Sequence, residues 1–572
     1  MRVRQSSHGL TVRAIAGTHN VILGIDLDPA RLKGCLGFSI QRARLELTRK
    51  APLEWVWLSN RVRFPKDSST HPVTTEHSPV QKFRWGDYTT EPGVEYRYRV
   101  IARYGHWDAL SIGETVELDL KTETPSAGGS SVFFNRGAAA SQAYNTLFGA
   151  KDPDTLEPQA RQKALAWLSR GLEEALLAFL AQARGKGDAV HAAVYEFQKP
   201  ELLAGLAGAA KRGAEVKAVY HHRQPGPKDT TWQKNDEAVA AGELARMGVQ
   251  LHSRQADPQN AISHNKFVVL LQGGKPRAVW TGSTNWTEGA IYGQLNVGHA
   301  VHDAQVASIY ERYFQLLFAD VQAGPLKLAT RELSPVLDQK DLPPGPGVWP
   351  ILSPQSNEDM LGLYASLCGR AHHLMVCAPF SLSPKLLDVL SCKPKRPGAL
   401  KYLLVDKPGS LGSAEQFQLI EGDSFNEVGV ATLLRGPLYD FQRRLLMTRE
   451  SFHHAGVHLH SKIIAVDPLG PDPIIITGSA NYSANSTLHN DENSLIIRGD
   501  LAVADIYATE FMRMFEHYHF RGALAKAGET RARKGQSATE VTLSLREDDS
   551  WSARFYVPGS TDALARALFA GV

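Results

Sequence analysis

Two short stretches of the chain share one pattern. The first reads Ser263-His264-Asn265-Lys266-Phe267-Val268-Val269-Leu270, and the second reads Leu459-His460-Ser461-Lys462-Ile463-Ile464-Ala465-Val466-Asp467. In each, a His-x-Lys triplet opens a run of apolar, mostly β-branched or large residues that is typical of a buried strand. Side chains at positions i and i+2 of a strand point to the same face, so each histidine is expected to project beside its own lysine.

A second motif follows each triplet at the same distance. The first copy continues to Thr281-Gly282-Ser283-Thr284-Asn285-Trp286-Thr287 and the second to Thr477-Gly478-Ser479-Ala480-Asn481-Tyr482-Ser483. In both copies the glycine of Gly-Ser-x-Asn lies 18 residues after the histidine. A lone His-x-Lys occurs by chance in many proteins, but two copies with this identical offset indicate an internal duplication.

The segments around the motifs repeat as well. The first copy predicts a helix over 164–183, a buried strand over 189–197, a helix over 200–213 and a strand over 215–220. The second copy predicts helices over 359–367 and 384–390, and strands over 373–378 and 400–405. This order implies an α/β fold with a mostly parallel sheet covered by helices. Two duplicated lobes are expected to pack about a pseudo-two-fold axis, which places equivalent edges side by side.

The first 125 residues carry a different pattern. Apolar and polar residues alternate over 53–58 and again over 94–101, which predicts an all-β sandwich domain. The run from Pro92 to Val100, which includes Tyr96 and Tyr98, resembles the late strands of a fibronectin type III domain. We expect these tyrosines in the sandwich core, and the alternating arginines of the same strand on a solvated face.

Turn-rich stretches set the expected domain boundaries. Residues 125–131 read as a flexible linker, and 341–347 separate the two copies. We therefore expect a β-sandwich over 1–125, a first lobe over 126–335, a second lobe over 336–525 and a C-terminal extension over 526–572.

The composition is that of an ordinary soluble globular protein. Hydrophobic residues make up 43% and charged residues 21%, and the net charge of +4 permits an anionic substrate without implying one. The sequence has no apolar run near the roughly 18 residues of a membrane span, and no signal-like start. Four cysteines are too few and too irregularly spaced for a disulfide framework or a zinc site. We expect a cytoplasmic protein. A single chain is expected to hold one complete active site, so a monomer is sufficient for activity and an oligomer is equally consistent with the sequence.

The paired motifs carry the side chains that a phosphodiester needs. Lys266, Lys462, Asn285 and Asn481 are suitable donors to its non-bridging oxygens. Two histidines can share the tasks of nucleophile and proton donor to the leaving oxygen. Glycine beside serine, in Gly282-Ser283 and Gly478-Ser479, is expected to let backbone and hydroxyl approach the phosphate closely.

The doubled motif resembles the signature of the phospholipase D superfamily, over roughly residues 130–525. The resemblance implies a covalent phosphohistidine that water or an alcohol attacks, with no metal ion and no cofactor. It implies site residues in both copies: His264, Lys266, Ser283 and Asn285 with His460, Lys462, Ser479 and Asn481.

The two copies differ at two positions. The motif's Asp is present as Asp467, where the family uses it as a brace, but Leu271 replaces it in the first copy. After Gly-Ser-x-Asn, the second copy has Glu492 where the first has only amides, Gln294 and Asn296. In the family such an acidic residue orients the histidine of the opposite lobe. We therefore expect Glu492 to hold His264 as the nucleophile, with His460 as general acid and later base.

The sequence leaves the substrate open. We favour a nuclease, because the chain is slightly basic and its β-sandwich is suited to bind a polymer or a partner protein. A phospholipid-acting enzyme is the alternative, with Trp286, Ile291 and Tyr292 as candidate membrane-facing residues. A catalytically inactive scaffold is the third, suggested by Leu271 alone. Arg136 is a candidate anion contact, and His221 is expected to be structural.

Overall fold

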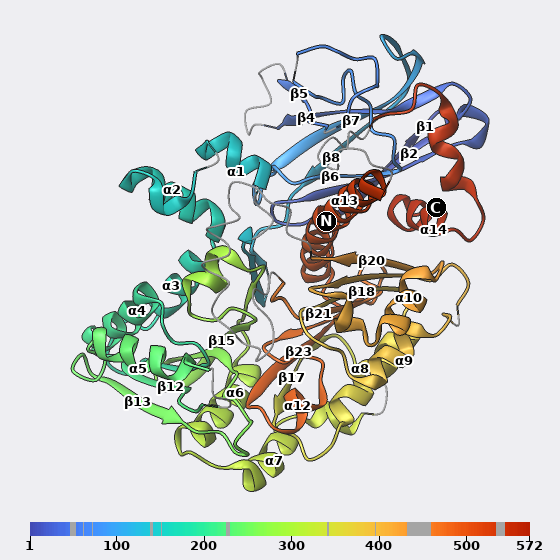
Figure 1. Ribbon diagram of the computed structural model, residues 1–572. Coiled ribbons are helices and arrows are strands. Elements are labelled where there is room, and N and C mark those ends of the chain that lie inside the picture. Colours follow the sequence, from blue (N-terminus) through green and yellow to red (C-terminus); the bar gives the residue numbers. More distant parts are fainter. Residues whose placement is uncertain are drawn as a thin grey trace.

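The computed structural model describes residues 1–45, 53–60, 62–70, 72–127, 129–137, 141–149, 151–224, 229–339, 342–394, 396–431, 459–533 and 544–572. A β-sandwich formed by the start of the chain lies above two α/β lobes, which lie side by side (Figure 1). The long helix α13 (Leu501–Arg533) runs between them near the centre (Figure 1). The predicted fold class, two duplicated α/β lobes preceded by an all-β region, is confirmed.

Two four-stranded antiparallel sheets form the sandwich, in the orders β1–β2–β3–β6 and β5–β4–β7–β8. Alternating residues of both sheets, Tyr96 and Tyr98 among them, form one buried core. The strands are β1 (Arg2–Ser7), β2 (Leu10–Ala16), β3 (Val21–Leu27), β4 (Cys35–Arg44), β5 (Trp55–Trp57), β6 (Arg84–Asp87), β7 (Glu95–His106) and β8 (Ala109–Lys121).

One tyrosine of the sandwich has a special contact. The Oη of Tyr96 accepts a hydrogen bond from the Glu91 N–H at 3.0 Å, the arrangement of a tyrosine corner in immunoglobulin-like sandwiches. On the outer face, Arg97 and Arg99 each form an ion pair with an acidic residue of β8, so this face is largely neutralised. The likeness to a fibronectin type III domain stays a prediction.

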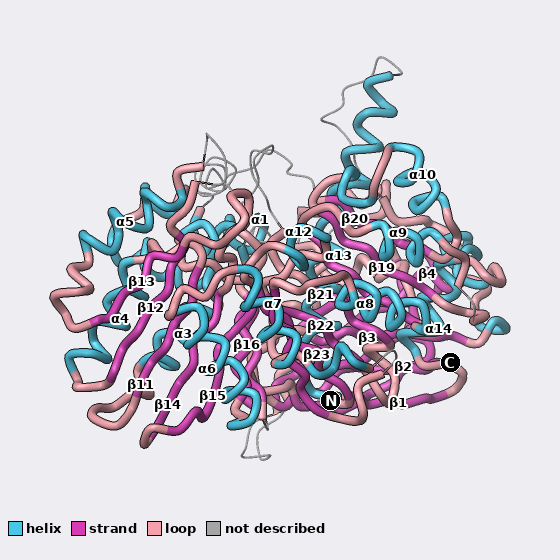
Figure 2. Tube along the Cα trace, turned by 90° about the horizontal axis from the view of Figure 1, so that it is seen from below, coloured by secondary structure: helices cyan, strands magenta, loops and turns pink. Residues whose placement is uncertain are grey.

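An eight-stranded mixed sheet forms the first lobe, in the order β13–β12–β11–β14–β15–β16–β10–β9 (Figure 2). Its strands are β9 (Ser126–Ala127), β10 (Ser130–Phe134), β11 (Ala189–Val194), β12 (Glu215–His221), β13 (Val249–Arg254), β14 (Lys266–Gln272), β15 (Lys275–Gly282) and β16 (Val297–Val301). Strands β11 to β13 run parallel, whereas all other neighbours are antiparallel. The prediction of a mostly parallel sheet is therefore wrong, because the tight turn between β14 and β15 can join only antiparallel strands.

Two further predictions for this lobe need correction. The predicted helix over 164–183 is two helices, because Arg170 and Gly171 adopt left-handed backbone angles (φ 52° and 90°) that end α2 before α3 begins. The predicted linker over 125–131 contributes β9 and part of β10 to the sheet. The helices are α1 (Ser141–Phe148), α2 (Pro158–Ser169), α3 (Leu172–Leu180), α4 (Pro200–Lys211), α5 (Thr231–Ala241), α6 (Ala304–Phe318) and α7 (Ala323–Glu332).

The second lobe repeats this plan with seven strands in the order β17–β23–β22–β21–β18–β19–β20. They are β17 (Gly347–Ser353), β18 (His373–Ala378), β19 (Leu400–Val405), β20 (Asn426–Val430), β21 (Ile463–Val466), β22 (Ile474–Gly478) and β23 (Glu492–Arg498). The helices are α8 (Asp359–Arg370), α9 (Pro384–Ser391), α10 (Ala414–Gly422), α12 (Ala484–Leu488) and α13. The predicted strands β18 and β19 have the bounds that the sequence indicated.

The C-terminal segment returns to the N-terminal sandwich. A 3-10 helix (Asp549–Tyr556) inserts Trp551 and Phe555 into the sandwich core, and the Trp551 indole donates to the Cys35 carbonyl at 2.9 Å. Helix α14 (Thr561–Ala570) then packs on β3 so closely that a Cβ at Gly24 would lie 2.2 Å from the Phe569 carbonyl. Residues 549–570 thus pack against the sandwich.

We predict that Trp551→Ala lowers the free energy of unfolding by about 3–5 kcal/mol, because it opens a cavity and leaves the Cys35 carbonyl unpaired. Urea unfolding followed by circular dichroism measures the change. Val557→Ala is the control, since Val557 is exposed in the same segment. Equal stability of the two variants would contradict the assigned packing.

Candidate active site

The two lobes exchange backbone contacts where the histidines lie. Just before β14 and β21, each His-x-Lys loop pairs with the segment that follows Gly-Ser-x-Asn in the other lobe. The N–H groups of His460 and Ser461 donate to the Leu295 carbonyl at 3.0 and 2.9 Å, and the Asp491 N–H donates to the Ile262 carbonyl at 3.1 Å. This exchange brings both histidines to one interface, the place that the pseudo-two-fold predicts.

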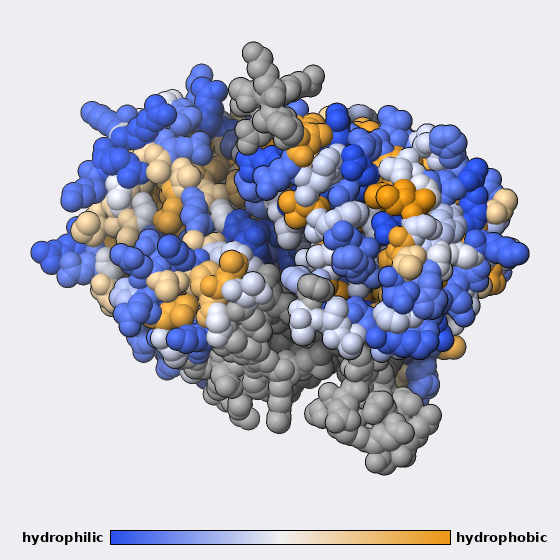
Figure 3. All heavy atoms as spheres, turned by 90° about the horizontal axis from the view of Figure 1, so that it is seen from above, coloured by the Kyte–Doolittle hydropathy of each residue, from blue (hydrophilic) through white to orange (hydrophobic). Residues whose placement is uncertain are grey.

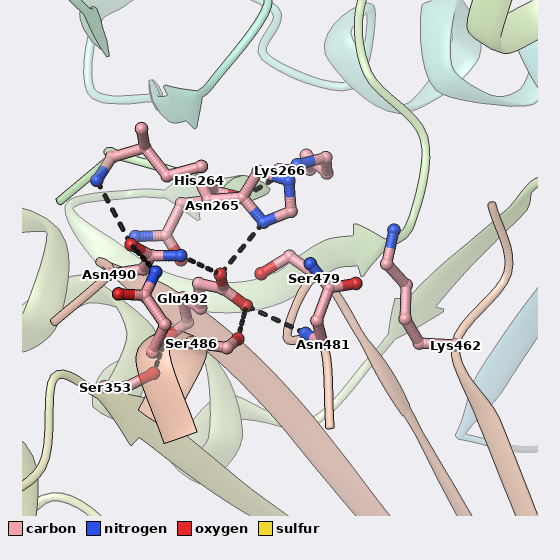
Figure 4. A network of polar contacts seen from close by, with 12 residues as sticks. His264, Asn265, Lys266, Ser353, Lys462, Ser479, Asn481, Ser486, Asn490 and Glu492 are labelled. Carbon is pink, nitrogen blue, oxygen red and sulfur yellow. Dashed lines mark hydrogen bonds and ion pairs between the residues drawn. The ribbon is translucent and has the colours of Figure 1, made fainter. Parts of the chain in front are cut away.

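A buried carboxylate contacts the first histidine. Glu492 Oε1 lies 3.1 Å from His264 Nδ1, and neither side chain is more than 1% exposed (Figure 4). The same carboxylate accepts hydrogen bonds from Asn490 Nδ2 at 2.8 Å, Ser486 Oγ at 2.6 Å and the Asn481 N–H at 3.1 Å (Figure 4). These three donors fix the position of the carboxylate. Glu492 is therefore oriented to hold a proton on Nδ1 of His264 and leave Nε2 to face the site.

An amide takes the corresponding place beside the second histidine. Asn296 follows Gly282 by 14 residues, as Glu492 follows Gly478. Its Oδ1 lies 2.8 Å from His460 Nδ1 and also accepts from Ser283 Oγ at 2.7 Å, while its Nδ2 donates to Ala290. Because Oδ1 can only accept, the proton of neutral His460 lies on Nδ1. The Nε2 then accepts from Lys462 Nζ, 3.0 Å away.

The lysines and the motif asparagines line the same interface. Lys266 Nζ donates to the His264 carbonyl at 2.9 Å and lies 5.1 Å from the centre of the Tyr195 ring. Asn285 Nδ2 donates to Glu196 Oε2 at 2.5 Å. Lys266, Lys462 and Asn285 are buried and Asn481 is half-buried, so ammonium and amide groups are held in a site with little water, where charge–charge interactions are strong.

The glycines and serines of the second motif contact protein rather than a free space. A Cβ at Gly282 would lie 2.2 Å from the Val297 carbonyl, and one at Gly478 would lie 2.3 Å from the Asn493 carbonyl. Ser283 Oγ accepts from the Val297 N–H, and Ser479 Oγ accepts from the Asn493 N–H. The motif thus ties its strand to the next one. The glycines and serines that the sequence predicted to meet phosphate have this structural role.

Two predicted residues lie apart from the histidines. Asp467 follows the far end of β21, and its Oδ1 accepts the His372 and His373 N–H groups at 2.8 and 2.6 Å. It braces the start of β18, while Leu271 packs in the core at the matching end of β14. The backbone carbonyl of Gln294 accepts from Asn135 Nδ2 at 2.7 Å, so this residue belongs to the loop that carries Asn296.

The sequence analysis missed two residues at this site, Glu196 and Asp406, and expected a third, His221, to be structural; Glu196 is buried against Asn285. The Nδ1 of His221 accepts the Ser263 N–H at 3.3 Å, and Asp406 Oδ1 accepts the Leu459 N–H at 3.1 Å in the other lobe. The ring of Tyr195 lies 5.0 Å from those of both His221 and His264. Aligning the two copies on their strand ends would have matched His221 with Asp406.

Comparisons with known proteins identify the lobes. Residues 176–318 and 374–515 each match the family described as cardiolipin synthase, PLD-like domain. The chain belongs to the phospholipase D superfamily and has its phosphodiesterase fold. The comparison with curated proteins gave no significant match.

Three solved structures illustrate the likeness. Phosphatidylserine synthase of Haemophilus influenzae is 12% identical over 66% of this chain and 94% of that chain, with a TM-score of 0.41. Polyphosphate kinase of Porphyromonas gingivalis is 11% identical over 56% of this chain, with a TM-score of 0.35, and this chain spans 45% of its length. Nuc, a phospholipase D family member of Salmonella typhimurium, is 21% identical over 26% of this chain and 87% of that chain, with a TM-score of 0.21.

We predict that Asp467→Ala lowers the free energy of unfolding by about 1–3 kcal/mol, because two half-buried N–H groups lose their acceptor. The rate of the chemical step should stay within about threefold, since the residue lies at the far end of the strand. Thermal unfolding and turnover of the same preparation measure both. Loss of turnover at unchanged stability would place Asp467 in the reaction instead.

A second prediction concerns His221. Burial lowers its pKa to about 3, so the folded protein holds it neutral while the unfolded chain protonates it below about pH 6.5. Stability should therefore fall as the pH drops from 6.5 towards 3. His221→Asn keeps an acceptor for Ser263 and removes this titration, so between pH 7 and 5 it should lose about 1–2 kcal/mol less than the parent. Identical pH slopes would contradict the neutral state.

Proposed function

We propose that the protein is a phosphodiesterase that works through a covalent phosphohistidine on His264. The observation that carries the proposal is the unequal pairing of the histidines, with a fixed carboxylate beside His264 and an amide beside His460. A carboxylate at Nδ1 stabilises the positive charge that forms on the imidazole when Nε2 attacks phosphorus. Glu492 is thus a positioning residue for the nucleophile.

The first half of the reaction forms the phosphohistidine. Nε2 of His264 bonds to phosphorus, and the bond from phosphorus to the leaving oxygen breaks. His460, in its imidazolium form, gives the Nε2 proton to that oxygen. The ammonium groups of Lys266 and Lys462, with Asn481, stabilise the negative charge on the non-bridging oxygens.

The second half returns the enzyme to its first state. His460, now neutral, takes a proton from water, and the water oxygen bonds to phosphorus. The bond between phosphorus and His264 Nε2 then breaks, which frees the nucleophile. An alcohol in place of water would give a transferred phosphodiester. No step needs a metal ion or a cofactor.

We propose a nucleic acid as the substrate. The three apolar residues that a lipid enzyme would have placed at a membrane, Trp286, Ile291 and Tyr292, are at most 4% exposed and belong to the core of the first lobe. On the face seen in Figure 3, apolar residues form small separate groups around a hydrophilic hollow. In the described part of the chain, no helix is long and apolar enough to span a membrane.

Phospholipid hydrolysis or head-group transfer is the second candidate function, because the same phosphodiester chemistry would serve it. An inactive scaffold is the weakest candidate, since the doubled motif retains both histidines and both lysines, all of them buried. Whether the enzyme acts on nucleic acid or on phospholipid, the β-sandwich would bind a polymer or a partner protein.

We predict that His264→Ala and His460→Ala each lower kcat by about 10²–10⁴, while His106→Ala, on the exposed sandwich surface, leaves it unchanged. The assay offers single- and double-stranded nucleic acid and phospholipid vesicles, with EDTA present. Cleavage of the polymer supports a nuclease, and release of a head group supports the lipid enzyme.

Trapping locates the nucleophile. Enzyme denatured in alkali, where the phosphoramidate bond is stable, should carry the phosphoryl adduct on His264. From a substrate whose leaving group needs no proton, His460→Asn should accumulate the adduct, because the water step lacks its base. An adduct on His460 with none on His264 would reverse the assignment, and loss of every activity in EDTA would contradict the mechanism.

A further inference from the structure

Three arginines converge where the first lobe, helix α13 and the sandwich meet. Arg136 follows β10, Arg170 joins α2 to α3, and Arg513 lies on α13. The turn between β2 and β3, with His19, comes from the sandwich and packs on the same helix, where a Cβ at Gly17 would lie 2.0 Å from Thr509 Oγ1. None of these residues takes part in the proposed reaction.

One carboxylate serves this cluster. Glu510 accepts from Arg170 Nη2 through one oxygen and from Arg513 Nε, at 2.8 Å, through the other. Arg136 has no acidic partner in the described structure: its guanidinium donates to the Trp167 carbonyl at 2.7 Å and lies 4.4 Å from that ring. The Nε of Arg170 has no partner there either.

The cluster therefore holds three positive charges against one negative charge in a buried setting. Arg170 and Arg513 are each 8% exposed. Burial and the neighbouring guanidinium groups lower the pKa of Arg136 to about 10 and that of Arg170 well below its usual value, and burial lowers that of Arg513 to about 10. Burial and the same three arginines lower the pKa of His19 to about 2. Uncompensated buried charge is costly, so the arrangement favours an added anion.

A chain of hydrogen bonds joins the cluster to the active site. Arg513 Nη2 donates to the Asn135 carbonyl at 3.0 Å, and Asn135 Oδ1 accepts the Asn296 N–H at 2.9 Å. Asn296 in turn contacts His460. Arg136 follows Asn135 in the sequence. The cluster is therefore next to the residue that bonds to Asn296, the partner of His460.

We propose that Arg136, Arg170 and Arg513 form a second phosphate subsite, which takes a phosphate group beside the one that is cleaved. Guanidinium groups bind phosphate oxygens in pairs and remain charged when buried, which suits them to this ligand. The proposal deepens the proposed function, because a strand of nucleic acid presents such a neighbouring phosphate.

Binding of inorganic phosphate tests the subsite without any catalytic turnover. Lys266→Met/Lys462→Met, which weakens the catalytic site, provides the background. We expect 10 mM phosphate to raise its Tm by about 2–4 °C, and Arg136→Gln in that background to abolish the rise. Arg161→Gln is the matched control, because Arg161 lies on α2 and pairs with Asp154 near the surface. The control should retain the full rise.

Two results would overturn the subsite: no rise in the double-lysine background, or an equal rise after Arg136→Gln. Arg136→Lys keeps the charge without the paired donors and should retain part of the rise, which separates ligand loss from misfolding.

Oligonucleotide cleavage identifies the source of the phosphate group. With the catalytic residues intact, Arg136→Gln should raise KM about tenfold at nearly unchanged kcat. The slope of log KM against log salt concentration should fall by about one, as expected for the loss of one phosphate contact. An unchanged KM with a lost Tm response would mean that the subsite binds free phosphate, and it would overturn the proposal that the subsite binds a phosphate of a nucleic-acid strand. If no nucleic acid is cleaved, the proposed function fails while the Tm response still decides the subsite.

Discussion

The exchange of backbone hydrogen bonds between the lobes is the constraint on which the site depends. Leu295 of the first lobe accepts the N–H groups that flank His460, and Asp491 of the second donates to the loop before His264. Neither lobe can complete its own half-site, because each histidine is held by the segment that follows the motif in the other copy. Packing of the lobes and assembly of the site are therefore the same event.

Duplication supplies a symmetric frame, and the side chains make it asymmetric. At matched positions the structure has Glu492 against Asn296, and Asp406 against His221. The backbone contacts are nearly the same in both halves, so the difference is one of charge. A symmetric frame with unequal charges lets two identical side chains take different parts in proton transfer.

The sequence predicted the parts of the fold that local patterns determine. Strands β18 and β19 were predicted with their observed bounds because each is a short apolar run between turn residues. The break at Arg170 and Gly171 was missed because the apolar spacing continues across it, although Gly171 is a local signal of such a break. The return of Trp551 to the sandwich depends on contacts between distant segments, which no periodicity records.

The same division applies to the site. The paired histidines, lysines and asparagines were found because they recur at one spacing. Asp406 was overlooked because its counterpart in the other lobe is His221, a residue of another type, so no repeat marks the pair. Asp467 shares the motif but lies at the other end of its strand, since seven residues of extended chain separate it from His460.

The insertion of Trp551 and Phe555 into the sandwich has a consequence for how the chain is made. The sandwich strands precede both lobes in the chain, yet their core lacks two aromatic side chains until more than 400 further residues have been translated. During that interval the two lobes can fold while the sandwich still exposes apolar surface. Completion of the sandwich core is thus tied to translation of the segment beyond the second lobe.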